Sequence, residues 1–298
     1  MANISLKQLR YFDALAQSLH FGRAAELCAV TQPALSMQIQ DLEKELGAVL
    51  IERTRQGTRL TPCGEEAARR AALILAGVRD LVDYAQHDGQ LLTGPLHLGV
   101  IPTIAPYVLP KVLPELRRNY PRLDLYLREA QTQYVLADLV AGKLDAALLS
   151  LPFEEPDIET CELFADRFVL ALPAARALPD QEVCATPEMF ENERLLLLEE
   201  GHCLRDQALS FCGLRQVQNL NTLGMTSLST IVQMVANGFG VTLLPQMSLE
   251  TEAQRADIRL LRFLPPEPER KIGLAWRQTS PRKRDFAELG AIITRLAA

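Results

Sequence analysis

The alternation of strand-like and helix-like segments over residues 91–298 constrains the fold of this chain most strongly. Short apolar runs typical of buried strands alternate with stretches of helical periodicity, and turn residues separate them. The expected strands lie at residues 96–101, 123–129, 145–149, 168–172, 195–198, 241–244, 258–261 and 271–276. The expected helices lie at residues 105–119, with an interruption near Pro110 and Pro114, and at 135–141, 204–211, 228–236 and 284–296. Alternation of this kind predicts βαβ units, a mainly parallel sheet and therefore the α/β fold class.

Length and composition limit the class of protein further. The 298 residues suffice for two or three domains, and 48% hydrophobic residues with a net charge of −6 describe an ordinary soluble protein. No apolar run approaches the length of a membrane span, and residues 1–15 lack the apolar region of a signal peptide. We therefore expect a cytoplasmic protein without a membrane partner. The six cysteines show no CxxC spacing and histidine is scarce, which predicts reduced thiols, no metal and no cofactor.

The first fifty residues predict three short helices. Ser5 is expected to cap the first, residues 21–27 form the second, and Thr31 is expected to cap the third, which ends at Gly47. Pro33 lies in the first turn of the third helix, where its missing N–H costs nothing. Two short helices joined by a tight turn predict a helix-turn-helix.

The polar face of the third helix and the segment after it suggest a DNA contact. The exposed face carries polar side chains that suit base edges and phosphates, namely Gln32, Ser36, Gln38 and Gln40. Residues 50–54 and 58–61 predict a small hairpin wing that carries Arg53, Arg55 and Arg59. The alternative is a plain three-helix bundle with a solvated polar face, and the clustered arginines weigh against it. A local basic face of this kind is compatible with the acidic total.

A long helix is expected between this segment and the α/β region. Residues 65–86 contain no proline, and apolar residues recur with spacings of 4, 3, 4, 3 and 4 at Ala67, Ala71, Ile74, Val78, Leu81 and Ala85. A heptad seam of this kind favours pairing with a second copy. The alternative is an amphipathic helix packed on its own domain. Residues 93–95, Thr-Gly-Pro, mark the boundary that follows.

Residues 201–212, with the sequence GHCLRDQALSFC, carry the most distinctive chemistry. The apolar run at 195–198 and the turn at 199–201 place Cys203 near a helix N-terminus. That terminus, with His202 and Arg205 as flanking cations, is expected to lower the thiol pKa, and Asp206 is expected to orient Arg205. A reactive cysteine followed nine residues later by Cys212 is typical of a redox sensor, whereas the alternative is a buried structural cysteine.

Three positions fit the rule that ligands of open α/β sheets bind beyond the carboxyl ends of strands. Thr103 follows the strand at 96–101, residues 201–203 follow the strand at 195–198, and Arg277 follows the strand at 271–276. The residues alone leave open whether these positions converge, because Thr103 also suits a helix cap and Arg277 a surface cation.

The N-terminal motifs resemble the winged helix-turn-helix of LysR-type transcriptional regulators. The resemblance is carried by FxRAA at 21–25, TQPALSxQIxxLExxLG at 31–47 and LIER at 50–53. It implies that the third helix enters the major groove of double-stranded DNA and that Arg53 contacts the backbone. The implied groove residues are Thr31, Gln32, Pro33, Ala34, Ser36 and Gln38.

The resemblance also implies an organisation and partners. A winged helix-turn-helix domain that is mainly α would occupy residues 1–62, a linker and dimerisation helix 63–90, and a two-lobed periplasmic-binding-protein-like α/β regulatory domain 91–298. Lobe I would span about 91–166 and 269–298, and lobe II about 167–268. The implied assembly is a homotetramer built as a dimer of dimers, with RNA polymerase as a further partner.

Within this family, the chain resembles the peroxide-sensing regulators at residues 94–103, 129–132, 144–145 and 201–212. That resemblance implies that Cys203 reacts with hydrogen peroxide, that Cys212 resolves the product as a disulfide, and that a cellular thiol reductant restores both. The residues implied to bind and polarise peroxide are Thr103, His202, Arg205, Asp206 and Arg277. The expected function is activation of antioxidant genes, and the chain is not expected to be an enzyme.

Two other functions are consistent with parts of this pattern. A LysR-type regulator that answers a small organic effector between the lobes would leave Cys203 incidental. A thiol peroxidase would use the same cysteine chemistry but gives no reason for the winged helix-turn-helix. Cys63 and Cys161 depart from the pattern of the family, and Cys28 and Cys184 are expected to pack rather than react.

Overall fold

The computed structural model describes residues 3–54, 57–86, 90–176, 184–186, 189, 193–211 and 224–297. The chain divides into two units, and each is described by itself. The first comprises Met1–Asp88 with Val140–Lys143, and the second comprises Gly89–Leu139 with Leu144–Ala298.

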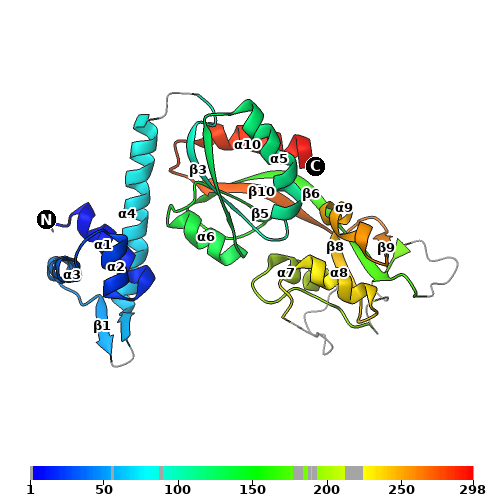
Figure 1. The fold of residues 1–298 in the computed structure, drawn as a ribbon, viewed down its shortest axis with the longest axis horizontal. Coiled ribbons are helices and arrows are strands. Elements are labelled where there is room, and N and C mark those ends of the chain that lie inside the picture. Colours follow the sequence, from blue (N-terminus) through cyan, green and yellow to red (C-terminus); the bar gives the residue numbers. More distant parts are fainter. Residues whose placement is uncertain are drawn as a thin grey trace. The chain divides into compact units, whose positions relative to one another are not determined.

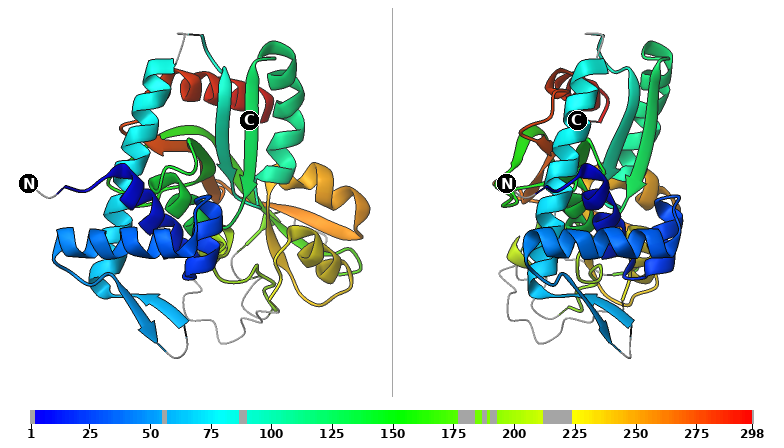
Figure 2. Two further views of the ribbon diagram at one scale, coloured as in Figure 1. Left: turned by 60° about the vertical axis from the view of Figure 1, so that its left-hand side comes forward. Right: turned by 90° about the vertical axis from the view of Figure 1, so that its left-hand side faces the viewer.

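The first unit is a helix-turn-helix with a hairpin. Its elements are α1 (Leu6–Ser18), α2 (Phe21–Leu27), α3 (Gln32–Leu46), β1 (Ile51–Thr54), β2 (Gly57–Leu60) and α4 (Pro62–Gln86). Ser5 caps α1 through a reciprocal capping box with Gln8, as predicted, whereas Thr31 occupies the N-cap position of α3 without a side-chain bond. The β1–β2 pair is antiparallel and confirms the predicted wing (Figure 2).

The burial of the predicted heptad seam of α4 changes along the helix. It is continuous and begins at Pro62, three residues before the predicted start. Ala71 is buried in the core of the first unit and Ala67 packs against it, so this end of the heptad seam stabilises its own domain. Ile74 and Leu81 remain 49% and 66% exposed, which leaves the later part of the seam available for pairing.

The second unit is an α/β structure whose elements follow the predicted order. The helices are α5 (Ala105–Asn119), α6 (Thr132–Val140), α7 (Cys203–Phe211), α8 (Leu228–Ala236), α9 (Leu249–Glu252) and α10 (Lys283–Ala297). The strands are β3 (Gly94–Val100), β4 (Leu123–Glu129), β5 (Ala146–Leu151), β6 (Ile158–Pro173), β7 (Cys184–Ala185), β8 (Thr242–Pro245), β9 (Ile258–Phe263) and β10 (Glu269–Arg277). Figure 1 shows β6 and β10 running together between the two groups of strands.

The sheet is mixed, so the prediction of a mainly parallel sheet was wrong. The strand order is β4-β3-β5-β10-β6-β9-β7, with β8 also pairing β6. The βαβ units around β3 are parallel, as alternation requires. The long strands β6 and β10 lie antiparallel to each other, and β10 is also antiparallel to β5, because the chain leaves along one and returns along the other. This reversal decides which end of β10 reaches the site.

Two further elements differ from the prediction. α5 continues through Pro110 and Pro114, because these residues and Pro106 are four positions apart on the solvent-facing side, where carbonyls that lose a partner contact water. Residues 195–198 form only isolated bridges, Leu195 to Val241 and Leu198 to Met225, rather than a regular strand.

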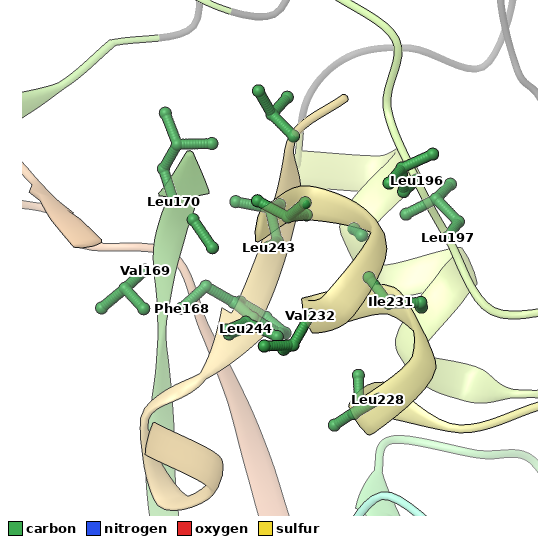
Figure 3. Packing of buried hydrophobic residues seen from close by; sticks show 14 of the residues in the cluster. Phe168, Val169, Leu170, Leu196, Leu197, Leu228, Ile231, Val232, Leu243 and Leu244 are labelled. Atoms are coloured by element: carbon green, nitrogen blue, oxygen red, sulfur yellow. The ribbon is translucent and has the colours of Figure 1, made fainter. Parts of the chain in front are cut away.

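The apolar core that supports the site joins α8 to β6 and β8. Figure 3 shows Val232 of α8 beside Leu244 of β8, and Leu228 and Ile231 of α8 belong to the same cluster as Leu170 of β6 and Leu243 of β8. The inner side of α7, formed by Leu204 and Ala208, belongs to the same cluster. Burial of Leu204 alone is worth about 1.5–3 kcal/mol, so this core fixes the position of Cys203 at the start of α7. In the part of the chain that the structure describes, no helix has the length and apolar character needed to cross a membrane.

Candidate functional site

Cys203 is the first residue of α7, one position before the predicted start of this helix. The residue as a whole is half-buried, whereas its thiol group is largely enclosed by the protein. The turn before it depends on Gly201, whose φ of +93° lies in the left-handed region. A Cβ on Gly201 would come within 2.5 Å of Gln131 Oε1, so the Gln131 side chain would have to move away from the turn. Gln131 also donates to the Glu200 carbonyl at 3.4 Å, which holds the turn against the start of α6.

Arg270, a residue that the sequence interpretation missed, is the cation of this site. It is 2% exposed and lies near the start of β10. Its Nη1 donates to Thr103 Oγ1 and its Nη2 to the Thr103 carbonyl, both at 3.0 Å. Its Nε donates to Asp166 Oδ2 at 2.9 Å. Thr103, itself 2% exposed, therefore lies where the sequence placed it, but Arg270 is its partner.

The pKa of Cys203 is raised, so the expectation of a lowered pKa was wrong. Burial has the largest effect because it disfavours the thiolate, and the nearby Asp206 carboxylate acts in the same direction. The Arg270 charge and the nearby Thr132 hydroxyl oppose this shift. Thr132 Oγ1 is buried and has no hydrogen-bond partner among the described residues. The site therefore stores a protonated thiol beside groups that stabilise its anion.

Arg277 is placed away from the site, which corrects the prediction. Its Nη1 donates to the carbonyls of Leu139 and Leu144, at 3.1 and 2.7 Å. Since β10 is antiparallel to β5, its beginning rather than its end meets the carboxyl ends of the parallel strands. Arg277 lies seven positions after Arg270 along β10, a distance of about 23 Å. The prediction assumed that β10 is parallel to its neighbours, so that its carboxyl end would lie at the ligand-binding edge of the sheet, but β10 is antiparallel to β5.

His202 and Arg205 do not provide the expected cations beside the thiol. Burial lowers the pKa of His202 below its usual value, so the imidazole is neutral at neutral pH. Arg205 Nη1 donates to the Leu198 carbonyl at 3.2 Å, which fastens α7 to the preceding segment. Asp206 is exposed, and no ion pair joins it to Arg205 in the described structure.

α7 is also tied to the neighbouring sheet. Gln207 Nε2 donates to Ser150 Oγ of β5 at 2.6 Å, and Ser150 Oγ donates to the Lys271 carbonyl at 3.2 Å. Cys212, the predicted resolving cysteine, lies outside the described residues. Of the two proposed redox cysteines, the structure therefore describes Cys203 alone, as a free cysteine.

The candidate DNA-binding residues lie on α3 and the wing. Leu35, Ile39 and Leu42 are buried on one side of α3. The opposite side leaves Thr31, Gln32 and Pro33 exposed and Ala34, Ser36 and Gln38 half-buried. Arg53 occupies β1 opposite Thr58, and its side chain is not among those described. Arg59 of the wing pairs with Glu52 at 2.6 Å.

The arrangement around Cys203 suits reduction of a small, uncharged oxidant. A buried thiol can form a thiolate against the Arg270 guanidinium, and the Thr103 and Thr132 hydroxyls offer hydrogen bonds to a bound oxygen. A charged or bulky oxidant would lose solvation on entering. The described residues include no group of three or more His, Cys, Asp or Glu side chains with the geometry of a metal site.

A sequence signal for Arg270 existed. Arg270, Ile272 and Leu274 alternate in phase on the buried side of β10, so this arginine occupies a core position. A buried arginine requires partners that satisfy its charge, which makes it a candidate site residue.

Comparisons with known proteins identify the family of the chain. Residues 6–65 match the family of bacterial regulatory helix-turn-helix proteins of the lysR family, and residues 89–297 match the LysR substrate binding domain. The chain is 40% identical over 290 residues to the DNA-binding transcriptional dual regulator OxyR of Escherichia coli, covering 97% of this chain and 95% of that protein. It is 45% identical over 294 residues to a Streptomyces viridosporus protein named "Probable hydrogen peroxide-inducible genes activator", with 97% of this chain and 93% of that protein covered.

Solved structures give the same relationship. A full-length OxyR variant from Pseudomonas aeruginosa aligns with a TM-score of 0.80 and 38% identity over 99% of both chains. A hydrogen peroxide-bound OxyR variant from Corynebacterium glutamicum aligns with a TM-score of 0.66 and 33% identity, covering 98% of this chain and 94% of that one. The chain thus belongs to the LysR family of bacterial transcription regulators and, within it, closely resembles the OxyR proteins.

Proposed function

We propose that this protein is a DNA-binding transcription activator that senses hydrogen peroxide through oxidation of Cys203 and a reversible Cys203–Cys212 disulfide. The observation that carries the proposal is the buried Cys203 thiol at the start of α7, within the field of an Arg270 guanidinium fixed to Thr103. Similarity to the hydrogen peroxide-inducible genes activators supports it. The proposed output is expression of antioxidant genes, and a catalytic peroxidase would have no use for the N-terminal domain.

The proposed chemistry has two steps. The Cys203 thiolate attacks one peroxide oxygen, the oxygen–oxygen bond breaks, and the leaving hydroxide takes a proton to become water, which leaves a sulfenic acid. Arg270 stabilises the developing charge, with Thr103 and Thr132 as hydrogen-bonding groups. The Cys212 thiol then attacks the sulfenic sulfur, and a second water leaves as the disulfide forms. A cellular dithiol reductant returns both cysteines to thiols by exchange.

Replacing Thr103 by Val is expected to slow the oxidation of Cys203. The change keeps the volume of a side chain that is 2% exposed but removes the oxygen that accepts from Arg270 Nη1. We expect a reduction of roughly ten- to a hundred-fold in the second-order rate with peroxide, since each loss of about 1.4 kcal/mol is tenfold. Stopped-flow fluorescence or rapid-quench mass spectrometry measures this rate.

Thr242→Val is a matched control. Thr242 is equally buried in the second unit, and its hydroxyl donates to the Leu196 carbonyl at 2.7 Å in the core of α8 and β8. It should retain the wild-type oxidation rate with some loss of stability. Equal slowing in both variants would mean that the effect of Thr103 is structural, and an unchanged rate in Thr103→Val would exclude Thr103 from the site.

We propose that α3 reads DNA with Thr31, Gln32, Pro33, Ala34, Ser36 and Gln38, while Arg53 contacts the backbone. Gln38→Ala should lower discrimination between specific and random DNA by about 1–3 kcal/mol, because a base-edge contact is lost. Gln17→Ala on α1, where Gln17 donates to Asp13, is the control and should leave discrimination unchanged. Fluorescence anisotropy with both DNAs at several salt concentrations measures the difference. Loss of affinity for both DNAs alike would assign Gln38 to the phosphates instead.

The proposed organisation follows the same relationship. The limits 1–62, 63–90 and 91–298 are supported by the family matches at 6–65 and 89–297. We propose a homotetramer built as a dimer of dimers, supported by the exposed Ile74 and Leu81 on α4. Contact with RNA polymerase, reduction by a cellular thiol and action in the cytoplasm, where the DNA lies, belong to the same proposal. A monomer in sedimentation of the purified protein would contradict the assembly.

A further inference from the structure

Asp166 divides its two carboxylate oxygens between two tasks. It lies on β6 directly opposite Arg270 of β10 in the antiparallel register (the strands are labelled in Figure 1), and it is 4% exposed. Its Oδ2 accepts from Arg270 Nε at 2.9 Å. Its Oδ1 accepts from the backbone N–H of Met247 at 3.0 Å, which prevents the carboxylate from turning. A carboxylate held on both sides fixes the plane of the guanidinium that it binds.

The hydrogen bonds of Arg270 show what that orientation achieves. A guanidinium carries five N–H donors in a rigid fork. Nε donates to Asp166, Nη1 to Thr103 Oγ1, and Nη2 to the Thr103 carbonyl and Met247 Sδ. One N–H of Nη1 has no acceptor among the described residues. The fork therefore has one donor left for an oxygen or a thiolate, and its direction is set by the anchor at Nε.

We propose that Asp166 is a positioning residue for peroxide reduction, which holds the Arg270 fork so that its remaining N–H faces the reacting sulfur and oxygen at Cys203. The proposal rests on the proposed function of Cys203. Asp166 has no part in the chemistry itself, since both of its oxygens are committed to Arg270 and Met247.

For Asp166→Asn, the proposal predicts a change in the Cys203 thiol pKa that is opposite in direction to the change expected from the charge of Asp166 alone. If Asp166 acted only as a negative charge near the site, Asp166→Asn would lower the thiol pKa and speed the reaction of Cys203. If Asp166 positions Arg270, the same change releases the guanidinium. The thiol pKa then rises and the reaction slows.

The experiment measures the rate of Cys203 alkylation by iodoacetamide as a function of pH in the full-length protein with the other cysteines changed to Ser. We expect the midpoint of the profile for Asp166→Asn to lie at higher pH than that of the parent. The rate of oxidation by peroxide should fall by roughly tenfold or more, because the thiolate loses the stabilising contact with the Arg270 guanidinium. Alkylation requires no peroxide, so it tests Asp166 independently of the proposed function. If the alkylation profile of Asp166→Asn shifts as expected but the parent protein does not react with peroxide, the proposed peroxide sensing by Cys203 is wrong, whereas the positioning role of Asp166 stands.

Asp285 provides a matched control. Its Oδ1 accepts from Leu92 N at 3.1 Å and its Oδ2 from Arg282 Nε at 2.9 Å, with Arg282 Nη2 also 2.8 Å from Oδ2, which is a similar arrangement in a buried pair elsewhere in the second unit. Asp285→Asn should disturb folding as much as Asp166→Asn but leave the pH profile of Cys203 in place. A profile that moves equally in both variants would overturn the proposal.

If Asp166→Asn folds poorly, a double-mutant cycle with Arg270→Met provides a second test. The double variant removes both the carboxylate and the guanidinium, so no buried charge is left unpaired. If Asp166 acts through Arg270, Asp166→Asn adds nothing to the rate loss of Arg270→Met. Additive losses, or a midpoint that moves to lower pH in Asp166→Asn, would contradict a positioning role.

Discussion

Cys203→Ser is expected to remove the response to peroxide entirely, and Cys212→Ser is expected to stop the reaction at the sulfenic acid. In the first variant no thiolate can attack peroxide, so the protein keeps its reduced conformation at any dose. In the second variant Cys203 still oxidises, but no partner condenses with the product. Intact mass after peroxide distinguishes the two, since Cys212→Ser gains one oxygen that a sulfenic acid reagent traps.

The geometry of α7 explains why the disulfide should act as a switch. Cys203 and Phe211 are the two ends of this helix, about 12 Å apart at 1.5 Å per residue. Cys212 is bonded to Phe211, so its Cα lies within about 3.8 Å of that of Phe211. The Cα atoms of the two cysteines are then at least about 8 Å apart, beyond the upper limit of about 6.8 Å for a disulfide. The bond therefore requires α7 to open.

Opening of α7 disturbs the contacts that hold it. Leu204 and Ala208 leave the core around α8, and Gln207 leaves Ser150. Amide hydrogen exchange of residues 204–211 should therefore rise on oxidation of the wild type and remain unchanged in Cys212→Ser. Equal exchange in both states, with the Cys203–Cys212 bond established by mass, would show that oxidation does not refold this segment. Cys161→Ser, which changes an exposed thiol, is the control and should respond as the wild type does.

Arg270→Met should slow the oxidation of Cys203, whereas Arg277→Met should lower stability and leave that rate unchanged, although both variants remove a buried arginine of β10. Arg270→Met removes the cation that lowers the pKa of Cys203 and the partner of Thr103. Loss of a preorganised donor of this kind costs on the order of 10²–10³ in rate. Because the thiol pKa rises further, the oxidation rate of Arg270→Met should reach its plateau only at higher pH than that of the wild type.

Arg277→Met should instead lower stability and leave the chemistry intact. Its guanidinium satisfies the carbonyls of Leu139 and Leu144, and loss of such bonds to buried acceptors costs about 1–3 kcal/mol. Urea unfolding and the peroxide rate, measured on both variants, separate the two roles. A slowed oxidation in Arg277→Met with the rate of Arg270→Met unchanged would restore the assignment made from the sequence.

The sequence predicted local structure well and strand direction poorly. The helix at 228–236 and the strand at 123–129 have their predicted bounds, because hydrophobic period and turn residues are local signals. The return of the chain along β10 is a long-range property, and periodicity carries no information on whether a strand runs parallel or antiparallel. The error over Arg277 follows directly from this.

The electrostatics of Cys203 also depended on tertiary structure. The sequence placed Cys203 at the start of a helix and His202 and Arg205 beside it, and the helix is confirmed. Neighbours in sequence turned out not to be the charge partners. His202 is desolvated and neutral, Arg205 binds a backbone carbonyl, and the cation comes from Arg270, which lies 67 residues further along the chain. Burial, which raises the thiol pKa, is set by the packing of elements that no local window contains.

The central claim is tested most directly by mapping the thiols after one equivalent of hydrogen peroxide. The reduced protein is treated with peroxide, the free thiols are alkylated, and the peptides are identified by mass spectrometry while the same sample is assayed for DNA binding. The account predicts that Cys203 and Cys212 are lost together as one disulfide, that Cys28, Cys63, Cys161 and Cys184 remain free thiols, and that the DNA-binding pattern changes in the same proportion. A change in DNA binding with Cys203 still reduced, or oxidation of the exposed Cys63 and Cys161 ahead of Cys203, would contradict it.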